Sequence, residues 1–152
     1  MKISIFSAFY PFRGGIAQFN TRLAKELKKE HEISCFTFKK QYPDFLFPGK
    51  TQFVDEKSID PTHAQRIVST FNPFTYFSAS KRINESSPSL FITNYWMTFF
   101  GPFMGFLAKK QGKQVKKIAI LHNLVPHEKR FFDTFFNRYF VKNYDGFVVL
   151  SN

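Results

Sequence analysis

The sequence predicts an α/β fold, in which a parallel β-sheet is covered by helices on both faces. Two observations support this prediction. Short apolar runs typical of buried strands alternate along the chain with longer runs in which apolar residues recur at helical spacing. In addition, the length of 152 residues is about that of one domain, and it is enough to bury a core without disulfide or metal support.

The first three predicted elements are a strand, a helix and a second strand. Residues 2–6 form a short apolar run that predicts a buried strand, and residues 32–38 form another. Between them, apolar residues recur at intervals of three and four while charged residues fall largely on the other side, which is typical of an amphipathic helix. The apolar positions of this helix are Ile16, Phe19, Leu23 and Leu27.

A long connection follows the second strand. Over residues 39–62 the periodic pattern is lost and turn-forming proline and glycine residues accumulate, with a short strand expected near residues 52–54. Connections of this length in compact domains are usually functional or mobile.

The rest of the chain continues the alternation of helices and strands. Asn72 and Pro73 are an N-cap and a first-turn proline, and they predict a helix whose apolar side carries Phe74, Phe77 and Ile83. The elements expected after it are a strand at 90–95, a helix at 97–111, a strand at 116–122, a helix at 129–143 and a strand at 146–150.

The composition favours an anionic partner. The chain contains 22 Lys and Arg residues against 11 Asp and Glu residues, a formal net charge of +11, together with 23 Phe residues. Such a balance suits nucleic acid, a phosphorylated substrate or an acidic membrane surface, and charge alone does not choose between them. The segment 129–142 places more aromatic side chains among basic ones than one buried stripe requires, which predicts peripheral contact with anionic lipid headgroups.

The sequence also indicates a cytoplasmic location, with peripheral contact at the inner face of the cell membrane. It shows no signal-peptide pattern, and its longest apolar stretch, residues 95–108, is broken by glycine and proline and is too short to span a bilayer. Cys35 is the one cysteine and lies in an apolar run, so we expect a small buried side chain rather than a disulfide or a nucleophile.

Two segments are candidates for the functional site. Gly14 and Gly15 lead from the first strand directly into a helix, and unpaired amides at such a glycine-flanked helix start favour a phosphate, with Arg13 as a nearby charge. His122 and Asn123 end a later strand, so they are expected at the same sheet edge, where ligands of open α/β sheets bind. Glycine turns and strand-end histidines also occur for purely structural reasons.

Several other kinds of site are not indicated. The sequence contains no Ser-His-Asp arrangement and no Walker A loop, and a dinucleotide-binding loop would need a third glycine near Ala17 or Gln18. An NAD enzyme is therefore not expected. His122 and His127 are separated by a proline-containing turn and lack the ligand count of a zinc site, so we expect no bound metal.

Several longer motifs complete the pattern, and together they resemble the N-terminal domain of family 4 glycosyltransferases over essentially the whole chain. They are Ser7-Ala-Phe-Tyr-Pro11 with Arg13-Gly-Gly-Ile-Ala-Gln-Phe19, the loop Tyr42-Pro-Asp-Phe-Leu-Phe-Pro-Gly-Lys50, and Leu121-His-Asn-Leu-Val-Pro-His-Glu-Lys129 with the final Asp145-Gly-Phe-Val-Val-Leu-Ser151.

The resemblance implies one half of a two-domain enzyme of the GT-B type, in which two Rossmann-like domains face each other across a cleft. Residues 1–152 would be the N-terminal, acceptor-side domain, whereas the donor-binding C-terminal domain is absent from this chain, so the fragment alone is expected to be inactive. Members of the family transfer a sugar from a nucleotide-sugar with retention of anomeric configuration, and they need neither a metal nor another cofactor.

The resemblance also implies an acceptor class and roles for individual residues. The acceptor would be a glycan or a lipid-linked sugar in the synthesis of cell-surface polysaccharide or glycolipid. The implied roles are donor-diphosphate binding for Gly14, Gly15 and Arg13, catalysis beside the transferred sugar for His122, and contact with acceptor or substrate for Asn123, His127 and Tyr10.

A different class of function remains open, namely a non-catalytic basic Rossmann-like module that binds nucleic acid or a protein partner. Charge and aromatic content suggest nucleic acid. However, the aromatic residues fall on core-like stripes and no known recognition motif accompanies them, so we expect no nucleic-acid partner.

Overall fold

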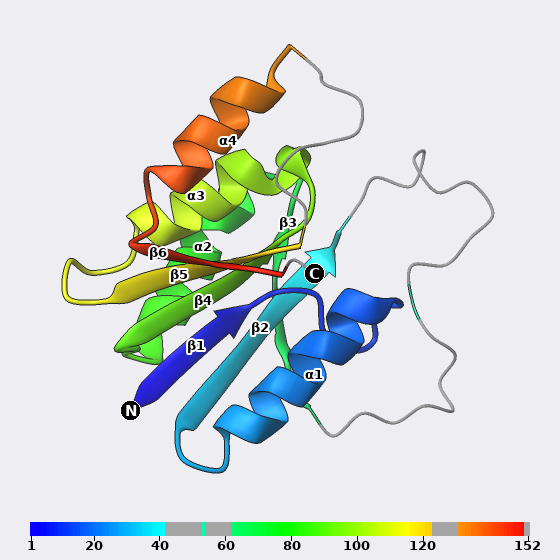
Figure 1. The fold of residues 1–152 in the computed structure, drawn as a ribbon, viewed down its shortest axis with the longest axis vertical. Coiled ribbons are helices and arrows are strands. Elements are labelled where there is room, and N and C mark those ends of the chain that lie inside the picture. The colour runs from blue at the N-terminus through cyan, green and yellow to red at the C-terminus, as the bar shows by residue number, and fades with distance from the viewer. Residues whose placement is uncertain (42–52, 54–61, 123–130, 151–152) are drawn as a thin grey trace.

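The strands of the sheet are all parallel. In the computed structural model, residues 1–41, 53, 62–122 and 131–150 are described, and they form one six-stranded sheet in the order β3-β2-β1-β4-β5-β6 (Figure 1). The strands are β1 (Lys2–Phe6), β2 (Glu32–Lys40), β3 (Gln65–Ser69), β4 (Leu90–Tyr95), β5 (Lys116–Leu121) and β6 (Gly146–Val149).

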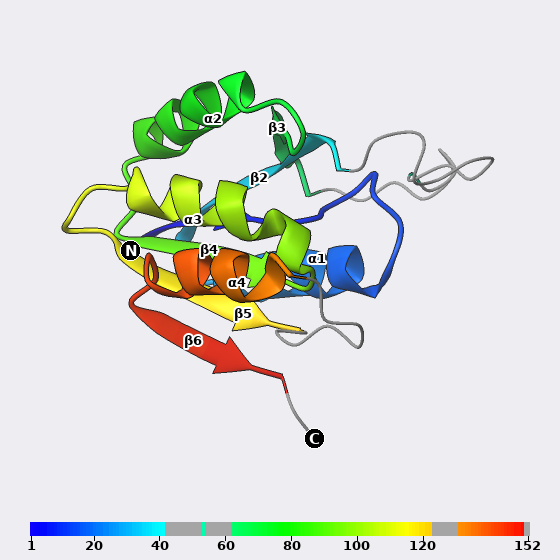
Figure 2. The same ribbon diagram turned by 90° about the horizontal axis from the view of Figure 1, so that it is seen from above.

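Helices cover both faces of this sheet, as predicted. The helices are α1 (Gly15–Leu27), α2 (Phe74–Glu85), α3 (Gly101–Lys109) and α4 (Asp133–Val141), with a short 3-10 turn, η2 (Thr98–Phe100), before α3. Helix α1 packs on one face, and α2, α3 and α4 form a layer on the other (Figure 2). The Rossmann-like α/β fold is thereby confirmed.

Strand β3 was not predicted. Its five residues include only two apolar side chains, Ile67 and Val68, which are both buried. A strand at the edge of the sheet is only partly covered by the rest of the protein, so few of its side chains need to be apolar. The strand expected at residues 52–54 lies largely outside the described residues, and Phe53 alone forms an isolated antiparallel bridge with Phe12.

Residues on successive strand positions divide between two apolar clusters. Ile3, Ile5 and the buried thiol of Cys35 belong to the cluster under α1, whereas Phe6 belongs to the cluster under the other three helices. This division follows from the alternation of side chains along a strand. It also confirms that Cys35 is a small buried residue.

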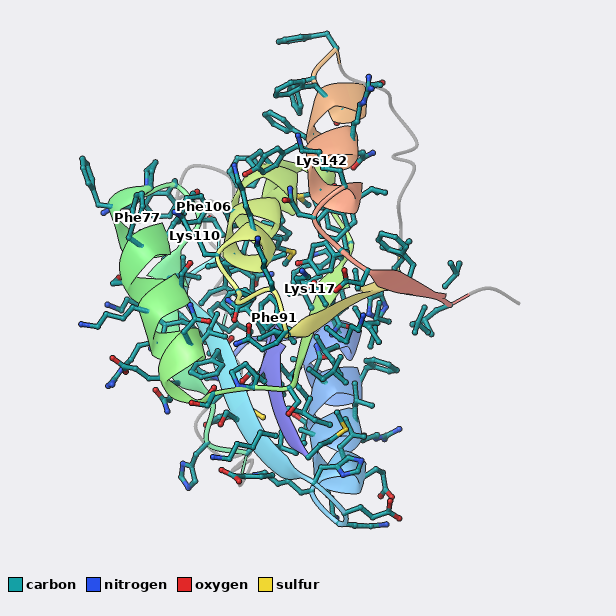
Figure 3. The ribbon with its side chains drawn as sticks, turned by 90° about the vertical axis from the view of Figure 1, so that its left-hand side faces the viewer. Phe77, Phe91, Phe106, Lys110, Lys117 and Lys142 are labelled. Carbon is teal, nitrogen blue, oxygen red and sulfur yellow. The ribbon has the colours of Figure 1, made fainter. Side chains whose placement is uncertain are left out.

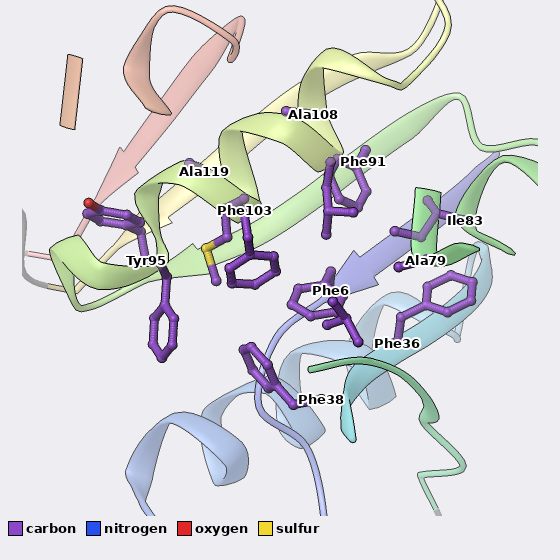
Figure 4. Close-up of a cluster of buried hydrophobic side chains, with 14 of the residues drawn as sticks. Phe6, Phe36, Phe38, Ala79, Ile83, Phe91, Tyr95, Phe103, Ala108 and Ala119 are labelled. Atoms are coloured by element: carbon purple, nitrogen blue, oxygen red, sulfur yellow. The ribbon is translucent and has the colours of Figure 1, made fainter. Parts of the chain in front are cut away.

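The larger cluster is built mainly from phenylalanine rings. Figure 4 shows Phe6, Phe38 and Phe103 converging from β1, β2 and α3. Their ring centres lie 4.9–5.8 Å apart in edge-to-face arrangements, which aromatic pairs prefer over face-to-face stacking. Elsewhere in the same cluster, the ring of Tyr95 on β4 stacks on the ring of Phe140 on α4, with 4.0 Å between the ring centres.

The most deeply buried residues of helix α1 are not those of its predicted apolar stripe. Ala17, Asn20 and Ala24 form its buried centre, because small side chains let a helix approach the strands closely. The four residues predicted for the buried face lie half-buried on either side of this centre, and they are Ile16, Phe19, Leu23 and Leu27.

Helix α2 is rotated relative to the prediction. Ile83 is buried as expected, but Phe74 and Phe77 point to solvent with relative exposures of 88% and 63%. The buried side of the helix instead carries Ala79 and Ser80. The apolar pattern of α2 therefore does not identify its core face. The exposure of its two phenylalanines, Phe74 and Phe77, is not explained by packing in the core.

Candidate functional site

The loops that follow β1 and β5 lie at the carboxyl edge of the sheet. Strand β4 separates these two strands and pairs with both of them. His122 comes directly after β5, and its backbone N–H donates to the carbonyl oxygen of Tyr95 at the end of β4 (2.8 Å). This is the edge at which parallel α/β sheets bind ligands.

Two buried phenylalanines hold the loop between β1 and α1. Phe9 and Phe12 are 0% and 2% exposed, and the N–H of Phe12 donates to the carbonyl oxygen of Phe9 (2.9 Å). The N–H of Phe9 donates in turn to the side-chain oxygen of Thr37 on β2 (3.3 Å). The loop therefore presents the start of α1 from a fixed position.

Helix α1 begins with an open, uncapped turn. Gly14 has φ 123° and ψ 169°, a conformation that is essentially restricted to glycine. No side chain caps the helix, and its first turn contains no acidic residue. A Cβ built on Gly14 or Gly15 would meet nothing within 4 Å. The free amides and the positive helix end are thus accessible to an anion, and the exposed Arg13 directly precedes them.

A buried hydrogen-bond network connects α1 to His122. The side-chain amide nitrogen of Asn20 donates to the hydroxyl of Ser7 (2.7 Å) and to the carbonyl oxygens of Ala8 (3.1 Å) and Ile16 (2.8 Å). The amide nitrogen of Asn94, on β4, donates to the side-chain oxygen of Asn20 (2.6 Å).

This network determines which nitrogen of His122 carries a proton. Backbone carbonyls can only accept, so Asn20 must turn its nitrogen toward Ala8 and its oxygen toward Asn94. Asn94 must then donate to Asn20 and offer its own oxygen to Nε2 of His122, at 2.7 Å. His122 therefore donates from Nε2, and its Nδ1 retains the lone pair when the ring is neutral.

The surroundings of His122 also favour its neutral form. The imidazole is half-buried, and the ring of Phe19 from α1 meets it edge-on with 5.3 Å between ring centres. Burial lowers the pKa of His122 below its usual value of 6.5. At neutral pH the ring is therefore an uncharged hydrogen-bond acceptor at the sheet edge.

The structure brings together some of the predicted site residues. Gly14, Gly15 and Arg13 lie at the start of α1, and His122 is linked to the same helix through its contacts with Phe19 and Asn94. The remaining predicted residues are Tyr10, which is half-buried in the loop after β1, and Asn123 and His127, which lie outside the described residues.

Sequence reasoning missed the two asparagines of the network. Asn20 lies in the middle of the apolar stripe of α1, and Asn94 interrupts the apolar run of β4. A polar residue at the centre of an apolar pattern is a signal of a buried hydrogen bond, since burying an amide without a partner is costly. That signal was present at both positions.

The described residues show neither a cluster of metal ligands nor a membrane-spanning helix. Within the described residues, no three His, Cys, Asp or Glu side chains gather as metal ligands would. None of the helices in this part of the chain is long and apolar enough to cross a membrane. The expected independence from metal stays a prediction.

Comparisons with known proteins show a shared fold. No family model matches the chain, and no curated protein sequence matches it. Among solved structures, it is similar to an alpha-glucosyltransferase in complex with UDP and a 13-mer DNA containing a central A:G mismatch, with a TM-score of 0.59 and 13% sequence identity. The match covers 98% of this chain and 37% of the glucosyltransferase chain.

The two glycines at the start of α1 should respond differently to alanine. We expect Gly14→Ala to lower the free energy of unfolding by about 1–3 kcal/mol, because alanine is strained at this positive φ even though the space is open. Gly15→Ala, at a helical position with open space, should be neutral or stabilising by up to about 1 kcal/mol. Chemical denaturation of both variants measures this, and equal stabilities would contradict the assigned backbone conformation.

The protonation of His122 is also testable. Nitrogen-15 NMR of the imidazole should show the tautomer protonated at Nε2, with a pKa below 6.5. Protonation opposes folding here, so the stabilising contribution is complete above about pH 6.5 and is lost as the pH falls through the lowered pKa. His122→Gln should remove that part of the pH dependence. Asn94→Leu should mix the tautomers, and an unchanged tautomer in that variant would contradict the network.

Proposed function

We propose that residues 1–152 are the acceptor-side domain of a retaining glycosyltransferase of family 4, accompanied in the active enzyme by a donor-binding domain. The observation that carries this proposal is the pairing of two features at one sheet edge. An open, uncapped helix start at Gly14 favours a diphosphate, and a neutral His122 offers a hydrogen-bond acceptor. The sequence resemblance supplies the family.

The chemistry of the site suits departure of a nucleoside diphosphate. Negative charge grows on that leaving group during transfer, and amides already oriented at the start of α1 stabilise it without having to reorganise. Arg13 adds a positive charge next to these amides. Nδ1 of His122 accepts a hydrogen bond from a hydroxyl of the transferred sugar and so orients it, while the Nε2 side of the ring is held by Asn94.

The similarity to the glucosyltransferase supports the choice of donor and the domain arrangement. That protein is described in complex with UDP, which fits a nucleotide-sugar donor for this chain. This chain spans about a third of that protein's length, 37%, which is compatible with one domain of a larger enzyme. The acceptor we propose is a glycan or a lipid-linked sugar of cell-surface polysaccharide or glycolipid synthesis.

A nucleic-acid-binding role is the second candidate. The glucosyltransferase is described with DNA as well as UDP, and this chain has a net charge of +11. A basic fold of this class that binds nucleic acid without catalysis would show oligonucleotide binding and no response to nucleotide-sugars. We favour the transferase because the uncapped glycine turn and the oriented His122 are features that a purely electrostatic binder does not need.

Binding of UDP to this chain tests the diphosphate site. In a titration followed by NMR, we expect amide shifts concentrated at Gly14, Gly15 and the next residues of α1, with weak affinity, about 1 mM or worse. Gly14→Val should abolish these shifts, whereas Gly112→Ala, in which the three atoms nearest to the added Cβ belong to the movable side chain of Gln114, should retain them. Micromolar binding or tighter would place the whole donor site in this domain and contradict the domain assignment.

Transfer in the two-domain enzyme tests the role of His122. We expect His122→Ala to lower the rate of transfer from a nucleotide-sugar by about 10² or more, a typical cost of losing one interaction that strengthens in the transition state. Gly112→Ala serves again as the control and should keep the parent's rate. If His122→Ala keeps both the melting temperature and the transfer rate, the site is misplaced.

A further inference from the structure

The helix layer on the α2–α4 face carries four strongly exposed phenylalanines. Relative exposure is 88% at Phe74 and 63% at Phe77, both in the first turns of α2. It is 97% at Phe131, in the turn directly before α4, and 71% at Phe135 inside α4. Groups of exposed large apolar side chains on a protein surface mark interaction sites.

A basic residue follows each pair of phenylalanines about one helical turn later. Lys81 comes four residues after Phe77, Arg138 comes three residues after Phe135, and Lys142 lies a further turn along. These spacings put aromatic and basic side chains on one face of each helix, and all three cations are exposed. The same order, aromatic first and basic second, therefore occurs on two separate helices.

Lysines also lie directly against the aromatic rings of this surface. The Nζ atom of Lys110 is 5.5 Å from the ring centres of both Phe77 and Phe106, and these three side chains gather between α2 and α3 (Figure 3). The Nζ atom of Lys142 is 5.6 Å from the ring centre of Tyr139 on α4. Positive charge thus accompanies the aromatic groups on every helix of the layer.

Little negative charge opposes these cations. The three helices contain two acidic residues, Glu85 and Asp133. Glu85 accepts a hydrogen bond from Arg82 (3.1 Å), and Asp133 is only 6% exposed. The layer therefore presents a positive, aromatic surface.

Along α2 and α4, the exposed phenylalanines and the basic residues lie at different distances from the helix starts. Helices that connect parallel strands run opposite to them, so α2 and α4 both begin near the carboxyl edge of the sheet. In Figure 3 the first turns of α2 and α4 are both at the upper ends of these helices, and Phe77 lies near the start of α2. Lys142 is the residue that follows the last turn of α4. The phenylalanines precede the cations along each helix: Lys81 lies about 6 Å beyond Phe77, and Arg138 about 4–5 Å beyond Phe135, along the helix axes.

We propose that the starts of α2 and α4 dock on a phospholipid bilayer that contains anionic lipids. Interfacial helices bury apolar side chains about 5–10 Å into the boundary between headgroups and acyl chains, while basic side chains stay among the phosphates. Phenylalanines at the helix starts that enter this boundary leave Lys81 and Arg138, about one helical turn farther along, near the phosphates. Stacking on single-stranded nucleic acid would instead need bases to reach aromatic rings and phosphates to reach cations along one groove.

This docking does not depend on the proposed transfer reaction, but it orients the candidate site. Gly14 and His122 lie at the same carboxyl edge, on loops that follow β1 and β5. A bilayer in contact with the first turns of α2 and α4 therefore lies at the edge that carries the site. A membrane-bound acceptor would reach that edge without leaving the bilayer surface.

Vesicle binding tests the proposal directly. Co-sedimentation with phosphatidylcholine vesicles containing about one-third phosphatidylserine should show binding that falls as salt rises from about 0.05 to 0.5 M. Vesicles of phosphatidylcholine alone should bind much less. Phe74→Ala with Phe77→Ala, and separately Phe131→Ala with Phe135→Ala, should each weaken partitioning about tenfold or more. The melting temperature should fall only slightly, because all four side chains are largely exposed, although Phe77 also contacts Phe106 and Lys110.

A charge-matched control separates this surface from the net charge of the protein. Lys81→Gln with Arg138→Gln should weaken partitioning about tenfold or more. Arg22→Gln with Lys25→Gln removes the same amount of charge from exposed positions on α1, on the opposite face of the sheet. This variant should change partitioning into anionic vesicles less than twofold. Equal loss in the two variants would overturn the proposal.

Two further results would also overturn it. One is equal binding of the parent protein to anionic and neutral vesicles. The other is binding to a DNA duplex or single strand that is tighter than binding to anionic vesicles at the same salt concentration and is lost in the same phenylalanine variants, which would assign the surface to nucleic acid.

Discussion

The hydrogen bonds of Asn20 are the interaction on which the arrangement of the site depends. From the centre of α1, its side chain bonds to the loop after β1 and to Asn94 on β4, and Asn94 bonds to His122 after β5. One helix and three strand ends are thereby held in register. Leaving any buried member without a partner costs about 1–3 kcal/mol, so a shift of α1 along the sheet is opposed at several groups at once.

The phenylalanines of this chain form two populations with different physical roles. Buried rings such as Phe6 and Phe103 interlock edge-to-face and position the strands. Helices α3 and α4 also approach each other very closely. A Cβ at Gly101 of α3 would lie only 2.9 Å from the carbonyl oxygen of Phe136 on α4. Exposed rings such as Phe74 contribute nothing comparable to the core. The aromatic content alone therefore does not measure how much core the protein has.

The strands were easier to predict than the site. Strands β1 and β4 lie where their apolar runs placed them, because buried parallel strands read as short continuous apolar segments. Gly14 and His122 were proposed as site residues because one lies at the start of the first helix and the other follows β5, and their roles stay predictions. The apolar patterns that Asn20 and Asn94 interrupt indicated that each is buried, but not that they bond to each other across 74 positions of the chain. Phe77 was misplaced because an apolar stripe looks the same whether it faces a core or another surface.

The single cysteine gives this fold a built-in probe of motion. Cys35 lies on β2 in the apolar cluster beneath α1 and is 5% exposed. A thiol reagent can reach it only when that cluster opens, so the rate of labelling in the native protein reports how often α1 separates from the sheet. Because α1 also carries the glycine turn and Asn20, the same rate describes how rigidly the uncapped start of α1 and the imidazole of His122 are kept together. No label has to be engineered for this purpose.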